Sequence, residues 1–368
     1  MFHESSKMEK QTVITMFIRI STPMLNPIIY SLKTKEIREA IKQLLNIKQI
    51  DFIVVCQLSM ENQTMTTEFI LLGLSSNPEI QMILFFVILI IYTITVLGNL
   101  LIILIIRTEH GLHTPMFFFL SHLAFIDICY STVTVPKMMA NYIANQKTVS
   151  LVGCIVQIFS FIHFACVDFS LLSVMAFDRY VAICNPLHYL IIMKKQMCKQ
   201  LVGGSWLMGF LDALINSLPL KYLKFCWVPS VNHYTCELPL LLSLSCSKIF
   251  TNYMLLLGSV IMFAFTPFFL IVVSYIYIIS SILRIHSAEG RSKAFSTCSS
   301  HLIVVCMFLF SAFFRYLKPS SQSPTDLEKV ISIQYIVITP MLNPIIYSLK
   351  NKDIKMVIRK KWQNLGKN

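Results

Sequence analysis

Seven long apolar segments decide what this chain can fold into. A helix needs about 20 mostly apolar residues to cross a bilayer, and such segments occupy 82–106, 115–140, 151–177, 199–219, 249–283, 298–317 and 327–349. With 55% hydrophobic and 13% charged residues, the chain lacks the composition of a soluble globular protein. The segments are too long and too continuously apolar for the alternating strands of a membrane barrel. We therefore predict an all-α membrane protein, a seven-transmembrane helix bundle surrounded by the lipid bilayer.

Basic residues are distributed unequally between the two ends of this predicted bundle. Outside the first 59 positions, fifteen Lys and Arg fall on the end with the segment after residue 179 and the C-terminal tail, and eight on the other. Because Lys and Arg accumulate in cytoplasmic loops, we expect a multi-pass plasma-membrane protein with its N-terminus outside and its C-terminus in the cytosol. Residues 350–361 predict a short amphipathic C-terminal helix. The net charge of +13 then reflects topology and anionic-lipid contact, and no nucleic-acid partner is expected.

A charged pair lies where the third apolar segment ends. Arginine is unfavourable at the centre of a bilayer, whereas at a helix end it reaches water, an acidic neighbour or a partner protein. The tripeptide Asp178-Arg179-Tyr180 therefore fits two functions. Arg179 is either part of a conformational switch or an ordinary anchor whose side chain extends to the interface.

Longer motifs around and beyond this pair resemble a known family. Met175-Ala-Phe-Asp-Arg-Tyr-Val-Ala-Ile-Cys184 resembles the end of the third span in rhodopsin-like G-protein-coupled receptors, and at this length it is similar to the olfactory receptors in particular. Three further stretches resemble that family's signatures and follow its order: Leu112-His-Thr-Pro-Met-Phe117, Lys293-Ala-Phe-Ser-Thr-Cys-Ser-Ser-His301 and Pro340-Met-Leu-Asn-Pro-Ile-Ile-Tyr-Ser-Leu-Lys-Asn351. Together they cover roughly residues 60 to 360.

The resemblance implies an odorant receptor, which is not an enzyme. It would bind small, mostly apolar ligands within the bundle and activate a stimulatory heterotrimeric G protein to raise cyclic AMP. The residues that the resemblance assigns to coupling and switching are Asp178, Arg179, Tyr180, Tyr275, Asn343, Pro344 and Tyr347. Helical position and resemblance together assign the ligand contacts to Phe161, Ile162, Ala165, Cys166, Ser259, Val260, Phe263, Ala312 and Tyr316. The outer half of the third span carries no acid, which argues against an amine-binding salt bridge.

Two other functions stay open at this point. A secondary transporter predicts inverted repeats and paired broken helices at mid-membrane, and the sequence contains neither. A non-signalling, decaying receptor copy is the second alternative, because Leu309 stands where the family has an aromatic residue after Phe308. This departure puts in doubt the usual coupling between the ligand and movement of the sixth span.

Two acids lie deep in the apolar segments. Asp127 is in the second span, and Asp168 of the third lies 14 residues after Cys154, about 21 Å along a helix. Buried carboxylates usually face the interior of a bundle and have a partner there. The resemblance implies that Asp127, Asp168 and Asn343 hold a sodium ion or share a proton. The alternative is two acids kept neutral by hydrogen bonds, and no other cofactor is expected.

Four of the 11 cysteines fall on the predicted outer side. Cys154, Cys226, Cys236 and Cys246 allow three pairings into two disulfides. The pattern of the resembled family selects Cys154 with Cys236 and Cys226 with Cys246. These bonds would tie the loop after the fourth span across the mouth of the bundle.

The first 59 residues do not fit a receptor. Residues 22–33 repeat residues 339–350 without a change, and two copies lack the tandem period of a repeat fold. We interpret 1–59 as a spurious or fused tail that resembles the end of another receptor, with a genuine extra domain as the alternative. The receptor domain is then 60–368. It starts at Met60 and places the glycosylation sequon of Asn62 in a short extracellular tail.

Overall fold

The computed structural model describes residues 68–75, 77–143, 147–225, 230–231, 233–247, 249–317 and 326–365. Within these ranges, several side chains are not described, including those of Leu309, Ala312 and Tyr316. Residues 1–59, Met60, Asn62 and Cys226 lie outside the described residues. The predictions that concern them stay predictions.

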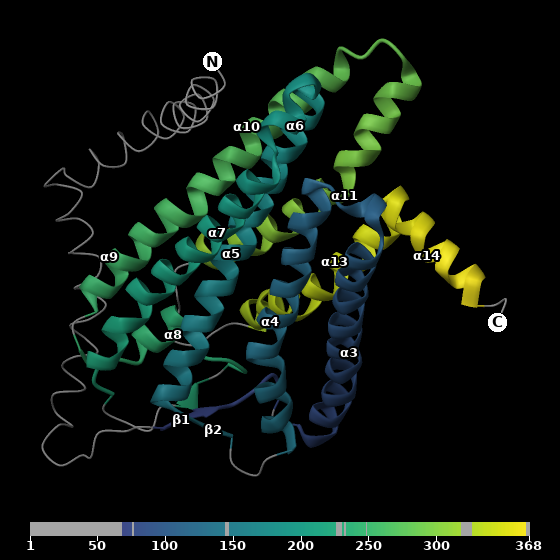
Figure 1. The fold of residues 1–368 in the computed structure, drawn as a ribbon. Helices are drawn as coiled ribbons and strands as arrows, with labels where there is room; N and C mark the ends of the chain where they lie inside the picture. Colours follow the sequence, from purple (N-terminus) through teal and green to yellow (C-terminus); the bar gives the residue numbers. More distant parts are fainter. Residues whose placement is uncertain are drawn as a thin grey trace, which may run out of the picture.

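Long helices run from one end of the structure to the other and pack side by side (Figure 1). In chain order the α-helices, long and short, are α3 (Pro78–Thr108), α4 (Pro115–Ile143), α5 (Leu151–Cys184), α6 (Tyr189–Ile192), α7 (Lys195–Ser217), α8 (Leu238–Ser243), α9 (Phe250–Ser259), α10 (Thr266–Leu283), α11 (Ala288–Leu317), α12 (Asp326–Ile333), α13 (Thr339–Lys350) and α14 (Lys352–Leu365). Within the described residues, six helical stretches are long and apolar enough to span a membrane. With the 30-residue α11 as the seventh long helix, the prediction of an all-α seven-helix bundle is confirmed.

Two spans change pitch just before a proline. The π-helical segments η5 (Val260–Phe265) and η6 (Gln334–Ile338) join α9 to α10 and α12 to α13. Pro267 and Pro340 follow within the next turn, and a proline has no N–H to complete an α-helical hydrogen bond. The fifth and seventh spans are therefore continuous helices with a locally wider turn, a feature that is frequent at functional sites.

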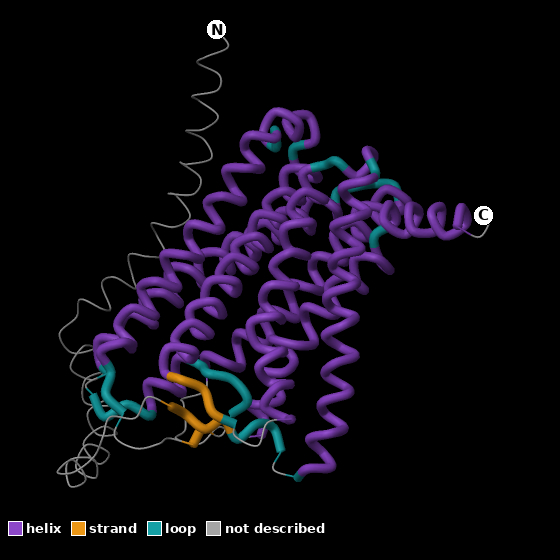
Figure 2. The backbone as a smooth tube through the Cα atoms, turned by 60° about the horizontal axis from the view of Figure 1, so that its bottom comes forward, coloured by secondary structure: helices purple, strands orange, loops and turns teal. Residues whose placement is uncertain are grey.

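A small sheet covers one end of the bundle (Figure 2). Its strands, in the order β2-β1-β3, are β1 (Glu68–Leu71), β2 (Thr148–Ser150) and β3 (Ser230–Val231). β1 pairs antiparallel with β2, with Phe69 opposite Val149, and parallel with β3. This sheet was not predicted, because strands of two to four residues are too short to show a period of two.

Apolar side chains are buried in two clusters. The larger lies between the helices and includes Leu123 and Leu171. The smaller lies under the sheet, where Phe69 and Leu71 of β1 pack with Leu242 and with the disulfide-bonded Cys154. The loops at this end therefore have an apolar core of their own.

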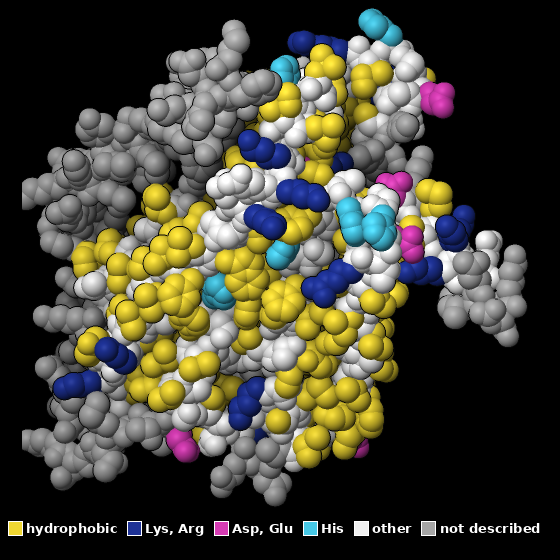
Figure 3. Space-filling view, in the orientation of Figure 1, with side chains coloured by type: hydrophobic (Ala, Val, Ile, Leu, Met, Phe, Trp, Pro, Cys, Tyr) yellow, Lys and Arg dark blue, Asp and Glu magenta, His cyan; other side chains and the backbone are white. Residues whose placement is uncertain are grey.

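The surface is apolar around the bundle and basic toward the end away from the sheet. α3 exposes a long series of apolar side chains, which includes Met82, Ile83, Phe86, Ile90, Leu97 and Leu104. Figure 3 shows hydrophobic side chains over much of one face and Lys and Arg gathered toward the end that carries α6 and α14. We call the end with β1, β2 and β3 the sheet end, and the end with Asp178 and Arg179 the arginine end.

The amphipathic helix α14 starts at the arginine end. Asn351 caps it, because Asn351 Oδ1 accepts hydrogen bonds from the backbone N–H groups of Asp353 and Ile354 at 3.0 and 3.2 Å. Lys361 lies against the end of α3, with Nζ 2.7 Å from Thr108 Oγ1 and 3.2 Å from Glu109 Oε1. These contacts attach the predicted C-terminal helix to the first span.

Candidate functional site

Arg179 lies near the C-terminal end of α5 and does not extend to solvent. It is 9% exposed, and Asp178 is 0% exposed. Arg179 Nε donates to Asp178 Oδ2 at 3.0 Å, and the Tyr189 hydroxyl of α6 donates to Asp178 Oδ1 at 2.9 Å. Burial, and then the neighbouring Asp178 charge, raise the pKa of Tyr189, so this hydroxyl keeps its proton at neutral pH. The Arg179 charge is therefore neutralised inside the protein, by Asp178 on the same helix.

A histidine of α11 links three spans close to this pair. His301 Nδ1 lies 2.7 Å from the Tyr275 hydroxyl of α10, and His301 Nε2 lies 3.1 Å from the Leu172 carbonyl oxygen of α5. A carbonyl only accepts hydrogen bonds, so Nε2 carries the proton and Nδ1 accepts from Tyr275. His301 was missing from the predicted site residues. The signal in the sequence is a polar residue inside an apolar segment, at the end of the motif Lys293–His301.

The two predicted interior acids lie together with Asn343 of α13. The Asn343 amide donates to both carboxyl oxygens of Asp127, at 3.0 and 2.9 Å. Asp168 is close enough to Asp127 for their charges to interact. Asp168 Oδ1, Asn343 Oδ1 and the Tyr347 hydroxyl are buried without a hydrogen-bond partner. The structure therefore brings the three predicted residues into one polar cluster in the bundle interior.

The unpartnered oxygens of this cluster fit a hard cation. Such cations prefer carboxylate and amide oxygens, and Asp168 and Asn343 each present one that is free. In the part of the chain that the structure describes, no three His, Cys, Asp or Glu side chains converge on a metal position. A sodium ion would thus need the Asn343 oxygen as a ligand, and a proton shared by the two acids fits the same geometry.

Pro344 interrupts α13 directly after Asn343. Because it has no N–H, it leaves the Pro340 carbonyl, four residues back, without its helical partner. Asn99 of α3 donates to this carbonyl at 3.0 Å. The close approach of the two helices depends on Gly98, since a Cβ atom there would lie 3.1 Å from Pro344 Cγ. The predicted switch residues Asn343 and Pro344 are thus positioned by the first span.

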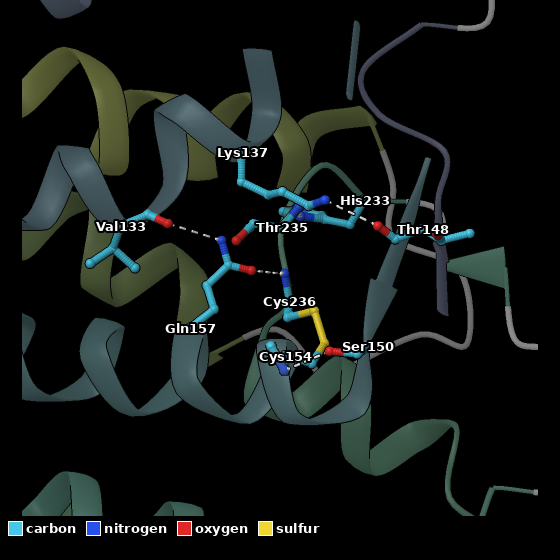
Figure 4. The surroundings of a disulfide bond; sticks show 10 residues. Val133, Lys137, Thr148, Ser150, Cys154, Gln157, His233, Thr235 and Cys236 are labelled. Carbon is cyan, nitrogen blue, oxygen red and sulfur yellow. Dashed lines mark hydrogen bonds between the residues drawn. A yellow bond between two sulfur atoms is a disulfide. The ribbon is translucent and has the colours of Figure 1, made fainter. Parts of the chain in front are cut away.

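At the sheet end, the predicted disulfide between Cys154 and Cys236 is present, with the two Cα atoms 5.4 Å apart (Figure 4). Gln157, one turn further along α5, lies next to this disulfide and forms hydrogen bonds on both sides. The Cys236 N–H donates to Gln157 Oε1 at 3.1 Å, and Gln157 Nε2 donates to the Val133 carbonyl of α4 at 3.4 Å. The loop is therefore attached to two helices. Cys246 is also disulfide-bonded, while its predicted partner Cys226 lies outside the described residues.

The described ligand-contact candidates lie on α5, α9 and η5. Phe161, Cys166 and Ser259 are buried, and Val260 and Phe263 of η5 are partly buried. Ile162 packs with the sheet-end cluster and Ala165 with the larger core. The side chains of Ala312 and Tyr316 are not described. Nothing in these positions contradicts the assignment, and none of them tests it.

Phe308, the residue before the departure at Leu309, takes part in an aromatic cluster. Its ring stacks on Phe169, with centroids 4.8 Å apart and planes at 16°. Tyr335 of η6 meets Phe308 edge-on at 5.7 Å and Phe161 at 5.7 Å. Aromatic contact therefore extends from a ligand-contact candidate to α11 without Leu309.

The fourth span contributes a buried acid that was not among the predicted site residues. Asp212 of α7 is 6% exposed, and Asn216, one turn further, is 4% exposed. Asn216 Nδ2 lies 2.9 Å from Asp212 Oδ1 and 2.7 Å from Ser259 Oγ of α9. α7 comes close to α5 here because Gly209 has no side chain: a Cβ would lie 2.6 Å from Val167 Cγ2. An acid and an amide four residues apart in an apolar segment were the signal for this cluster.

Comparisons with known proteins agree with this architecture. The profile of the family "Olfactory receptor" matches residues 88–364. Olfactory receptor 8S1 of Homo sapiens is 49% identical over 298 residues, which are 81% of this chain and 82% of the relative. Olfactory receptor 8G50 of Mus musculus is 48% identical over 306 residues (83% and 98%), and olfactory receptor 1f45 of Rattus norvegicus is 47% identical over 305 residues (82% and 97%).

The fold comparison reaches further than the sequence similarity. Squid rhodopsin is 18% identical, has a TM-score of 0.62, and is matched over 79% of this chain and 87% of its own. The bundle is thus a rhodopsin-like fold, and the transporter alternative falls away. Since the family profile covers most of the chain and the relatives are nearly half identical, the chain belongs to the olfactory receptor family, multi-pass plasma-membrane receptors that signal odorants through G proteins.

Proposed function

We propose that this receptor binds small, mostly apolar odorants between the sheet-end halves of the third, fifth, sixth and seventh spans. It then activates a stimulatory heterotrimeric G protein at the arginine end and raises cyclic AMP. In this proposal the sheet end faces the outside and the arginine end the cytosol. The observation that carries it is the buried contact of Arg179 with Asp178, which Tyr189 completes.

The contact defines a resting state. Leaving one partner of a buried ion pair without a counter-charge costs about 3–5 kcal/mol, so Arg179 leaves Asp178 only when another group accepts its N–H donors. A G-protein segment that enters at the arginine end supplies such acceptors. The odorant contributes by binding one packing of the helices better than the other, which shifts their populations.

Apolar side chains beside Tyr189 offer a docking surface for the G protein. Leu187 is 90% exposed, and Leu190 is exposed as well. Large apolar side chains that gather in water beside a polar network are typical of protein interaction sites. Since Tyr189 lies between them in the chain, a partner that binds Leu187 and Leu190 acts on the residue that holds Asp178.

The ligand contacts and the interior cluster complete the proposal. The candidates from Phe161 to Tyr316 are mainly apolar, as small-molecule sites usually are. Asp127, Asp168 and Asn343, with a sodium ion or a shared proton, lie between the ligand region and Arg179. They are in position to respond to a change in helix packing.

A cyclic-AMP reporter screen tests the proposed coupling. The full chain is expressed in cells with and without the stimulatory Gα subunit and exposed to a chemically broad odorant panel. We expect at least one odorant to raise cyclic AMP only in cells that contain the subunit. A response that persists without the subunit would assign another G protein. Silence from receptor that reaches the surface would favour the decaying copy that Leu309 suggests.

We further propose that residues 1–59 are dispensable. They carry eight Lys and Arg, which oppose transfer across the membrane ahead of the first span. The form that starts at Met60 has no basic residue before that span, so we expect stronger surface staining and a glycosidase shift at Asn62. If only the full chain is glycosylated at the surface and signals, the segment is a genuine part of the protein.

A further inference from the structure

The cluster of Asp212, Asn216 and Ser259 lies in the region proposed for the ligand. α7 runs toward the sheet end, and Asp212 is five residues before its last residue, Ser217, about 7.5 Å along the helix. Asp212 is also close enough to the Cys166 thiol of α5 for an electrostatic interaction. Cys166 and Ser259 are both ligand-contact candidates. The acid therefore adjoins the proposed site from a helix that was not included in it.

Hydrogen-bond donors in this cluster are fewer than acceptors. The two N–H groups of the Asn216 side chain are shared by the Asp212 carbonyl oxygen, Asp212 Oδ1 and Ser259 Oγ, at 2.9, 2.9 and 2.7 Å. The Ser259 hydroxyl, which has one proton to donate, interacts with the Asp212 carboxyl group. Asn216 Oδ1 remains buried without a partner. Among the salt bridges of the described residues, none involves Asp212.

A site that lacks only donors is completed by a ligand that brings them. A buried acceptor without a donor destabilises the protein, and a buried carboxylate without a counter-charge does so more strongly. An ammonium group offers three N–H donors and a positive charge, and its bonds to a carboxylate are stronger than those of neutral groups. A hydroxyl group offers one donor and no charge.

We propose that Asp212, with Asn216 and Ser259, binds the head group of the odorant, and that this receptor prefers small aliphatic amines. This deepens the proposed function and rests on its ligand site. It also changes one conclusion from the sequence. The absence of an acid in the outer half of the third span argued against amine ligands, but the acid is supplied by the fourth span instead.

The test measures binding without signalling. The purified full chain in lipid nanodiscs is heated with hexylamine, 1-hexanol or heptane, which have similar size and differ in donors. We expect hexylamine to raise the unfolding temperature at the lowest concentration and heptane to have no effect. Asp212→Asn should raise the half-effective hexylamine concentration about tenfold or more, since hydrogen bonds to charged groups are strong. The half-effective concentration of 1-hexanol should change by less than a factor of about three.

Two further variants secure the result. Ser205→Ala is the matched control, because Ser205 is buried on the same helix and its hydroxyl donates to the Leu201 carbonyl of that helix. It should leave the hexylamine effect unchanged. Ser259→Ala keeps the acid and should raise the half-effective hexylamine concentration less than Asp212→Asn does. If Asp212→Asn does not fold, this increase in Ser259→Ala is the test of the site.

Failure of the amine site and failure of the G-protein coupling give different results. Equal stabilisation by the three probes, or an undiminished hexylamine effect in folded Asp212→Asn, would show that the cluster only joins α7 to α9. Receptor that binds hexylamine through Asp212 but raises no cyclic AMP would contradict the proposed G-protein coupling and leave the amine site standing.

Discussion

The two ends of the bundle are held together in different ways. At the sheet end, a disulfide, backbone pairing of β1 with two strands and a separate apolar cluster fix the loops. At the arginine end, Asp178, Arg179 and Tyr189 are joined by side-chain hydrogen bonds. A disulfide contributes about 2–4 kcal/mol and a binding partner does not replace it, whereas a hydrogen-bonded charge can exchange its partner. The sheet end is therefore fixed in shape, whereas the contacts of the arginine end can be exchanged.

Cys154→Ser is expected to have the largest effect, because it removes the covalent link of the sheet end. Loss of a native disulfide costs about 2–5 kcal/mol, and we expect surface expression to fall below detection. Cys184→Ser is the control, since Cys184 is a free thiol at the arginine end. Non-reducing peptide mapping of the wild-type receptor, isolated from the cell surface, should recover Cys154 joined to Cys236. A free Cys154 thiol in that material would remove the difference between the two ends.

Gln157→Leu should have a smaller effect at the same end. It leaves the buried Cys236 N–H without an acceptor, at a cost of about 1–3 kcal/mol. We expect a lower unfolding temperature in nanodiscs with the disulfide intact. Gln196→Leu, at an exposed position of the arginine end, should leave that temperature unchanged. Equal temperatures for both variants would mean that the disulfide and the sheet hold the loop without help from Gln157.

Tyr189→Phe should have the smallest effect, and it acts on signalling rather than on stability. It removes one of the bonds that hold Asp178 in the resting state, so basal cyclic AMP should rise by up to about tenfold, which corresponds to ~1.4 kcal/mol. Tyr222→Phe, an exposed tyrosine at the sheet end, serves as the control. Basal signalling that stays at the wild-type level in Tyr189→Phe would show that Tyr189 does not stabilise the resting state.

The helices could be predicted because a bilayer leaves few choices. Apolar segments of sufficient length must form helices that satisfy their own backbone groups, and the bundle follows. The sheet could not be predicted, since Phe69, Val149 and Ser230 come from three separate segments and pair only after the helices bring them together. The π-helical turns before Pro267 and Pro340 were not predicted either, because a proline inside an apolar segment can also kink or end the helix.

The candidate site was predictable where a charge interrupts an apolar segment. Asp127, Asp168 and Arg179 carry that signal and lie in the polar clusters that the structure contains. Asp212 carries the same signal, but its role depends on Ser259 of another helix, which no single-segment pattern reveals. Tyr189 begins the four-residue helix α6, which lies between two spans, and the partner of its side chain depends on how this connection folds back against α5.

If Arg179 exchanges Asp178 for a G-protein partner on activation, agonist-stimulated cyclic AMP must depend on its side chain, and Arg179→Ala removes that side chain. Lys199→Ala is the control, because Lys199 is an exposed basic residue at the same end. Both variants are compared with the wild type at equal surface staining. We expect no agonist response from Arg179→Ala and a normal response from Lys199→Ala. A full agonist response from well-expressed Arg179→Ala would contradict it.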